Sequence, residues 1–184
     1  MASALPRSTK SSGGALSVAR TLLVWTSRPA EIANLLNPAF ASLLIRSAAH
    51  GYTRDDPSGL PLTLAYLLLP IVLHRKTRES LPRTTKTRVH TWLQANQHIL
   101  AGFAERASQM VPYTREALLF GAQQSIFVLN ASARLDVTTV RLRSVQRAES
   151  LEVGECLSRA ELLGRLFARA GDSATILAMW GVRP

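Results

Sequence analysis

The stretch GLPLTLAYLLLPIVLHRKTRESLP, residues 59–82, decides the fold, because it joins the most apolar segment of the chain to a basic one. Between positions 60 and 73, only Thr63 has a side chain that is neither apolar nor proline. This run is shorter than the roughly 20 residues that a membrane-spanning helix needs. Pro70 also interrupts it, and a proline inside a helix costs about 3 kcal/mol unless the helix kinks there. We therefore predict a helix that is buried at the centre of a protein core, and no membrane span.

The sequence before this stretch predicts a second helix, over residues 38–50. Asn37 can cap its first turn, Pro38 suits the first helical position, and Gly51 can close its end in a left-handed conformation. Residues 15–25 are also compatible with a helix. Residues 1–14 are basic and contain no acidic side chain, and we interpret them as a disordered arm, although a mitochondrial transit peptide has a similar composition.

After the basic segment, the pattern predicts one long helix over residues 85–111, capped by Thr84 or Thr85 and ended by Pro112. A helix from residue 115 to about 124 would follow. The long helix is predicted because its apolar residues recur mostly every three or four positions. These residues are Val89, Trp92, Leu93, Leu100, Phe103, Ala107 and Met110.

A β-hairpin is predicted near residues 125–143, where SIFVL and RLDVTTVRLR flank the turn NASA. A helix followed by a basic hairpin has the outline of a winged-helix module. A polar connector over 144–157 should lead to a helix over 159–170, opened by a capping box of Ser158 and Glu161. Asp172 or Ser173 should cap a last short helix that runs through Trp180. The predicted fold is thus mainly α, with residues 15–184 forming one compact helical domain that carries a small, winged-helix-like hairpin.

The residues with catalytic or ligand chemistry form no recognisable site in the sequence. The one cysteine, Cys156, excludes an intramolecular disulfide and a cysteine-rich zinc site, and suggests a reduced, cytoplasmic setting. Glu152 and Glu155 should raise the pKa of its thiol, which is the wrong direction for a nucleophile. The four histidines lack metal-binding spacing, and no glycine-rich phosphate loop is present. We expect no enzyme, cofactor or metal site, although a Ser–His–Asp triad is defined only in space.

Basic residues are the remaining candidates for function. The chain has 22 lysines and arginines against 12 acidic residues, a formal charge of +10 that favours polyanions or an acidic partner. A solvated basic face is the plainer interpretation, and no interleaved aromatic residues indicate base stacking. The candidate contacts to nucleic acid or to an acidic partner are Arg75, Lys76, Arg78, Arg83, Lys86, Arg88, Arg134, Arg141 and Arg143.

Several stretches resemble one known family. They are NPAFASLLIRSAAHGY (37–52), the opening stretch (59–82), RVHTWLQANQHILAGFAERASQMVPYTREALLFG (88–121) and AGDSATILAMWGVRP (170–184). Their order and spacing resemble the middle component of bacterial three-component ABC-ATPase conflict systems, relatives of Lamassu-type anti-phage and anti-plasmid defence. The similarity extends from about residue 30 to the end of the chain, and none of the stretches is a catalytic motif.

The resemblance implies a non-enzymatic adaptor that joins an SMC-like ABC ATPase to an effector, often a nuclease, and that meets DNA through the complex. It assigns no contact to any individual residue. The residues themselves leave two other interpretations open. A free-standing winged-helix protein would bind duplex DNA with a steep salt dependence. A membrane-associated or organelle-targeted protein would be retained on membranes or lose its first residues.

Overall fold

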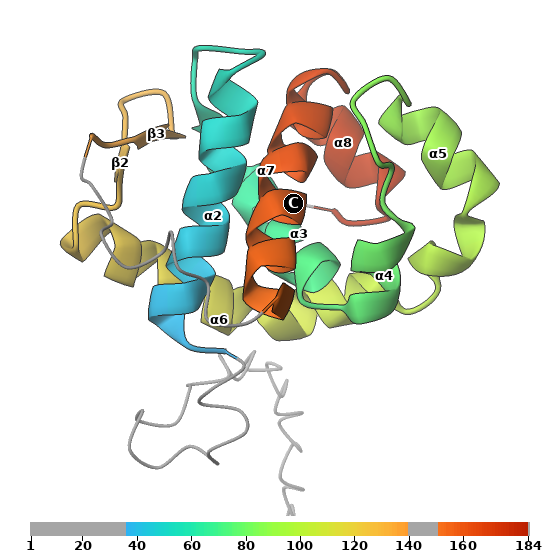
Figure 1. The fold of residues 1–184 in the computed structure, drawn as a ribbon, viewed down its shortest axis with the longest axis horizontal. Helices are drawn as coiled ribbons and strands as arrows, with labels where there is room; N and C mark the ends of the chain where they lie inside the picture. The colour runs from blue at the N-terminus through green and yellow to red at the C-terminus, as the bar shows by residue number, and fades with distance from the viewer. Residues whose placement is uncertain (1–35, 140–150, 184) are drawn as a thin grey trace, which may run out of the picture.

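The structure, a computed structural model, describes residues 36–139 and 151–183 (Figure 1). It confirms a mainly α-helical fold with a small antiparallel sheet. The proposed arm over residues 1–14, the helix expected at 15–25, and Arg141 and Arg143 lie outside the described residues. The elements in chain order are α2 (Pro38–Thr53), β1 (Leu60–Pro61), α3 (Leu62–Val72), α4 (Arg75–Ser80), α5 (Val89–Ala95), the 3-10 helix η2 (Gln97–Leu100), α6 (Phe103–Gln123), β2 (Phe127–Leu129), β3 (Arg134–Val137), α7 (Leu151–Ala168) and α8 (Ser173–Met179).

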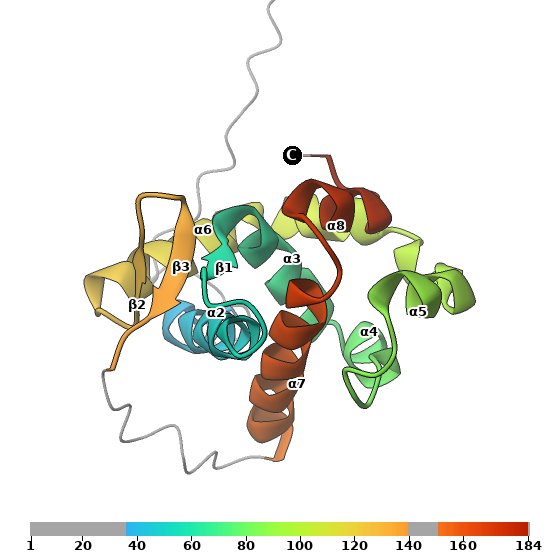
Figure 2. The same ribbon diagram turned by 90° about the horizontal axis from the view of Figure 1, so that it is seen from above.

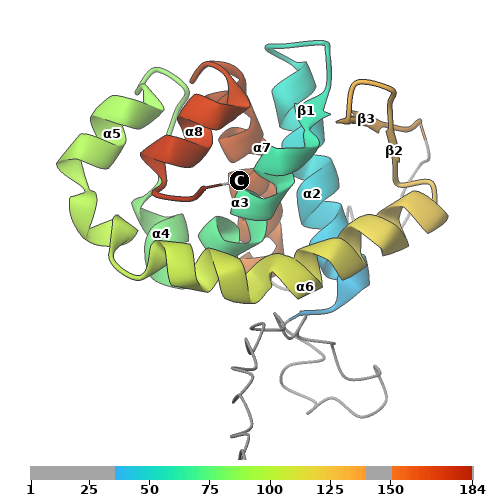
Figure 3. The same cartoon turned by 180° about the vertical axis from the view of Figure 1, so that it is seen from behind.

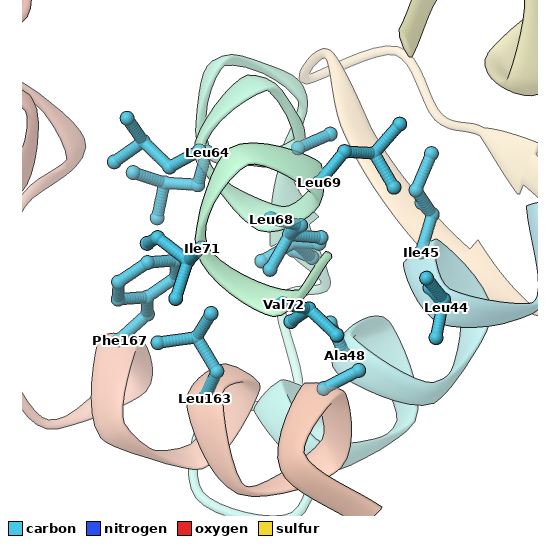
Figure 4. Packing of buried hydrophobic residues seen from close by; sticks show 14 of the residues in the cluster. Leu44, Ile45, Ala48, Leu64, Leu68, Leu69, Ile71, Val72, Leu163 and Phe167 are labelled. Carbon is cyan, nitrogen blue, oxygen red and sulfur yellow. The ribbon is translucent and has the colours of Figure 1, made fainter. Parts of the chain in front are cut away.

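The apolar helix α3 lies at the centre of the core, as its sequence predicts. From Leu64 to Val72 every residue except Tyr66 is buried. α2, α6, α7 and α8 all contact α3, and its side chains point outward on several sides toward α2 and α7 (Figure 4). Pro70 does not break the helix and is itself buried, so it serves core packing. No helix among residues 36–139 and 151–183 is long and apolar enough to cross a membrane.

α2 and α7 run side by side against α3, and glycines set how closely they approach (Figures 1 and 2). Gly51 lies inside α2, so the prediction that it ends the helix is wrong. A Cβ on Gly51 would collide with the carbonyl oxygen of Glu161, and one on Gly164 would collide with that of Ala48. The missing side chains bring the two backbones to the distance at which Cα–H groups contact carbonyl oxygens across a helix pair.

The prediction of one continuous helix over residues 85–111 is wrong, because the structure divides this segment into α5, η2 and the start of α6. α5 ends at Ala95, and the side-chain amide of the next residue, Asn96, donates to the carbonyl oxygen of Trp92 at 2.8 Å. Gly102, with φ of 68°, then turns the chain into α6. The expected stop at Pro112 is also wrong. Pro112 lies within α6, and the carbonyl that loses its helical donor belongs to the exposed Ser108, where water can replace the donor.

The apolar residues of that segment nevertheless reach the core. Trp92 of α5 and Phe103 of α6 both pack against Trp180, with ring centroids 6.0 and 4.6 Å away. Trp180 is 1% exposed and follows α8 directly. A broken helix can therefore bury the same residues as a continuous one, because both of its parts fold back onto the same aromatic centre.

α7 spans Leu151–Ala168, so the predicted connector is wrong over residues 151–157, and the predicted capping box is wrong as well. The rest of the predicted connector, residues 144–150, lies outside the described residues. Ser158 lies inside the helix and donates to the carbonyl oxygen of Glu155 at 2.9 Å. Glu161 instead accepts a hydrogen bond from Arg54 at 2.7 Å. The predicted cap of the last helix is confirmed, since Asp172 accepts from the amide of Thr175 at 2.9 Å.

The predicted hairpin is confirmed as β2 and β3, and the short strand β1 extends it into a sheet of order β1-β3-β2. Leu135 of β3 pairs with Leu60 of β1 on one side and with Leu129 of β2 on the other. β1 was missed because it has only two residues and leads directly into α3. The sheet lies at one end of the molecule, beside α2 and the end of α6 (Figure 1).

Ion pairs between Asp55 and two arginines join the loop after α2 to the end of α7. Asp55 accepts hydrogen bonds from Nε of Arg165 at 2.9 Å and from Nε of Arg169 at 3.0 Å. The hydrogen bonds from Arg169 and then Arg165 hold the pKa of the Asp55 carboxyl below its usual value. The pair therefore stabilises the fold only while Asp55 is ionised.

We predict that Gly164→Ala destabilises the protein, although alanine is the better helix former by about 1 kcal/mol. The added methyl group must separate α7 from the Ala48 carbonyl, and overpacking of this kind costs about 1–3 kcal/mol. Ser108→Ala, on the exposed side of α6, is the control and should be neutral or slightly stabilising. Urea unfolding measures both, and a gain in stability for Gly164→Ala would contradict the close helix contact.

We predict that Asp55→Asn lowers the melting temperature near neutral pH but not in strong acid. The folded pKa of Asp55 lies below the unfolded value of about 3.9, so its stabilisation is complete above about pH 5. That stabilisation is lost as the pH falls through the folded pKa, and the two melting curves should then converge. Glu79→Gln, which breaks the exposed pair with Arg75, is the control and should change little. A melting difference that persists unchanged at about pH 2 would exclude this ion pair as its source.

Candidate functional site

Five of the predicted basic residues form an exposed surface along α4 and the loop that joins it to α5. Of these, Arg75 donates from Nε to the carboxylate of Glu79 at 2.7 Å, one helical turn away. Within residues 36–139 and 151–183, the other four make no side-chain hydrogen bond or ion pair, and they are exposed. We name this set the basic segment; its members are Arg75, Lys76, Arg83, Lys86 and Arg88.

Arg78 lies between these residues in sequence but inside the protein in space. Its side chain is only 3% exposed. One terminal nitrogen donates to the carbonyl oxygen of Val72 at 3.0 Å, and the other donates to Glu152 at 3.0 Å. Its Nε is 3.8 Å from the carboxylate of Glu155. Arg78 therefore joins the end of α3 to α7, and it has no surface left to offer a phosphate.

Arg106 of α6 has a similar role, which the sequence did not indicate. Its Nε donates to the carbonyl oxygen of Pro70 at 3.2 Å, and its guanidinium lies 5.2 Å from the centre of the Phe103 ring. Burial lowers the pKa of Arg106. Arg78 and Arg106 thus supply donors to two carbonyls at the C-terminal end of α3, where a helix also favours positive charge.

The basic residues of the hairpin are not brought together with the basic segment in the part that the structure describes. Arg134 donates to the hydroxyl of Ser58 at 2.7 Å and to the carbonyl oxygen of Gly59 at 2.9 Å, and so fastens β3 to the loop before β1. In Figure 3 the hairpin and α4–α5 lie at opposite ends of α6. Whether the hairpin acts as a wing stays a prediction, because its last basic residues fall outside the described range.

Two of the residues considered for catalysis or metal binding, Cys156 and His74, are engaged in the fold. Cys156 lies on α7 and is buried, and burial is the main reason why the pKa of its thiol is raised, with Glu152 and Glu155 adding to it. His74 caps α4 by accepting from the amide of Thr77 at 3.3 Å, and burial lowers the pKa of His74. Within residues 36–139 and 151–183, no group of three or more His, Cys, Asp or Glu side chains could hold a metal ion.

An apolar groove of about 360 Å³ opens between the C-terminal half of α6, the start of α3 and the sheet. Leu119 on its rim is 65% exposed, and Leu129 is 53% exposed. The sequence did not indicate this groove, because its lining comes from four separate elements and follows no single periodicity. The lining residues are Leu62, Tyr66, Arg115, Leu118, Leu119, Ala122, Phe127, Leu129 and Leu135.

We predict that Arg78→Met lowers the free energy of unfolding by about 2 kcal/mol, the scale of a lost hydrogen bond from a charged group. Methionine keeps most of the side-chain volume but leaves the Val72 carbonyl without its donor. The matched control is Arg83→Met, an exposed position where the change should stay within about 0.5 kcal/mol. Equal losses for the two variants in urea unfolding would show that Arg78 does not hold the end of α3.

No curated protein and no solved structure matches the chain. One family does match, over residues 25–184, and it is described as the ABC-three component (ABC-3C) system Middle Component 3. The match spans nearly the whole chain and includes every element that the structure describes. It confirms the resemblance to a middle component that the sequence stretches suggested. The chain therefore belongs to the Middle Component 3 family of ABC-three component systems.

Proposed function

We propose that this protein is a non-enzymatic adaptor that links an SMC-like ABC ATPase to an effector, in particular a nuclease, within a bacterial defence complex. Membership in a middle-component family over residues 25–184 is the observation that carries the proposal. A component of a multi-component ABC system has protein partners. The proposal adds two statements to this. The partners are the ATPase and the effector, and the purpose of the complex is defence against phage or plasmids.

The geometry supports a role in binding, because the elements that carry two different surfaces, α4–α5 and the hairpin, lie at opposite ends of one body (Figure 3). The basic segment lies beside the start of α6, and the apolar groove lies along its last turns. The groove-lining residues of α6, from Arg115 to Ala122, lie roughly 18 to 28 Å along the helix from its first residue, Phe103, at a rise of 1.5 Å per residue. An adaptor needs two faces whose spacing is fixed, and a long helix packed on the core fixes it.

The polar chemistry of the described residues also fits binding better than catalysis. Arg78, Arg106 and Arg134 each donate to backbone carbonyls, and Asp55 is held by two arginines at the end of α7 and directly after it. Large apolar side chains are exposed instead, at Leu119 and Leu129 among others. Exposed apolar groups that cluster beside a groove are typical of a protein interface.

The proposal predicts that the tagged chain, co-expressed with the ATPase and effector of its own system, recovers both in one complex. Omitting the chain should leave the ATPase and effector unlinked, because the adaptor supplies the contact between them. Size-exclusion chromatography with mass determination measures both results. Direct association of ATPase and effector without the chain, or turnover of a substrate by the purified chain alone, would refute the adaptor role.

The exposed basic segment favours DNA contact as a second candidate function. The triple variant Arg83→Glu, Lys86→Glu and Arg88→Glu tests it without disturbing the buried Arg78. If the lone chain binds duplex DNA, the variant should lose that affinity, and the dependence of log affinity on log salt should fall by about 0.9 for each phosphate contact removed. Under the adaptor proposal, the lone chain has no such affinity to lose, and the effect appears only in the assembled complex.

A further inference from the structure

β2 is an exposed edge strand that lacks the usual protection. The sheet order β1-β3-β2 leaves β2 paired on one side only within the described chain. Its sequence is Phe-Val-Leu, and Val128 and Leu129 are 48% and 53% exposed. Edge strands are normally protected by charged side chains, proline or a bulge, since their open backbone groups pair readily with another strand. β2 has none of these within its three residues.

The hydrogen-bond pattern shows which backbone groups of β2 face outward. The amide of Asn130 donates to the carbonyl oxygen of Arg134 at 2.8 Å, which makes these two residues a hydrogen-bonded pair. Antiparallel pairs alternate, so Val128 forms the next such pair with Asp136. The N–H and C=O groups of Phe127 and Leu129 are therefore directed away from β3. Phe127 is only 1% exposed, so the groups that an added strand can reach are those of Leu129.

The apolar groove lies against the same two residues. The side chains of Phe127 and Leu129 line it together with Leu119 and Leu118 of α6. A strand that paired with the edge of β2 would place its own alternate side chains on the groove side of the sheet. Backbone pairing and apolar burial are thus available to one extended segment at once.

The charge beside the groove indicates which kind of segment binds there. Arg115 is the one charged side chain among the groove-lining residues, and it is exposed and makes no hydrogen bond or ion pair within residues 36–139 and 151–183. The chain's own first 30 residues contain no Asp or Glu and would bring further positive charge, including Arg20 and Arg28. A second copy would bring a second Arg115 and a second formal charge of +10. The groove therefore suits a different protein that carries a carboxylate.

We propose that an extended, apolar segment of another subunit of the complex adds as a strand to the edge of β2. Its alternate apolar side chains enter the groove, and an Asp or Glu beside them pairs with Arg115. This inference rests on the proposed adaptor function, because it requires a partner subunit, and it assigns that partner's contact to one end of the molecule.

The test uses the full-length chain in the complex assembled with its co-expressed ATPase and effector. A photocrosslinking amino acid at position 119 should join the chain to a partner segment that is apolar and contains Asp or Glu, identified by mass spectrometry. Leu119→Asp should weaken binding of that subunit by at least about tenfold, the range of a central interface residue. Leu151→Asp is the matched control, since Leu151 is 97% exposed but lies outside the groove. The affinity of this variant for the partner subunit should be unchanged.

A pair of variants at one position separates strand addition from simple apolar contact. Leu129→Ala removes groove-lining atoms, whereas Leu129→Pro also removes the outward N–H, so the proline variant should bind more weakly than the alanine variant. Arg115→Glu should also weaken binding, and a Lys in place of the crosslinked acidic residue of the partner should restore it. Thermal unfolding of each variant shows whether the fold is retained. The crosslinking experiment does not depend on a destabilising substitution.

Each outcome distinguishes this inference from the adaptor function. A complex that forms with wild-type affinity in the Leu119→Asp and Arg115→Glu variants would overturn the groove assignment and leave the adaptor function standing. A crosslink to a second copy, or to residues 1–35 of the same chain, would also overturn it. Failure of the wild-type chain to join any subunit of its system would overturn the adaptor function, and this inference with it.

Discussion

Burying a helix that is apolar on nearly every side leaves its terminal carbonyl groups without water, and the rest of this structure depends on how they are satisfied. An unpaired buried carbonyl costs about 1–3 kcal/mol. In α3, the carbonyl oxygens of Pro70 and Val72 accept hydrogen bonds from Arg106 and Arg78, at 3.2 and 3.0 Å. These two arginines come from α6 and α4, so capping the central helix also fixes the positions of its neighbours.

The surfaces available for function follow from that arrangement. Two of the chain's basic side chains are used to complete the core, and a third, Arg134, fastens the sheet to the loop before β1. Positive charge remains exposed mainly along α4 and the loop after it, within the described chain. The apolar surface remains at the other end of α6, where the edge strand and the groove meet. The proposed adaptor role uses these two ends, and membership in a middle-component family implies that the protein has partners.

The sequence indicated the core better than it indicated the connections. Composition alone placed α3 at the centre, because a 14-residue apolar run has few other places in a folded chain. Predictions of helix ends from local capping residues failed where contacts between helices determined the structure. Gly51 has the sequence context of a helix end, but it is a glycine because α7 passes against it. Ser158 and Glu161 have the spacing of a capping box, yet both lie inside a helix that begins seven residues earlier than Ser158, at Leu151.

The same limit applies to the candidate site. Arg75, Arg78 and Arg83 look equivalent in a basic stretch, and only the structure separates the buried Arg78 from its exposed neighbours. The groove could not be predicted, because its residues come from α3, α6, β2 and β3 and meet only in the folded protein. Family membership was indicated by the order of several stretches together, which individual motifs did not show.

The central claim is that the apolar run from Leu62 to Val72 belongs to a protein core and not to a lipid bilayer. Hydrogen exchange of the full-length chain, alone in buffer without detergent or lipid, tests this most directly. The account predicts that amides in the second half of α3 are among the slowest to exchange and open only with global unfolding. Rapid exchange of these amides in buffer, with protection appearing only after lipid vesicles are added, would contradict it.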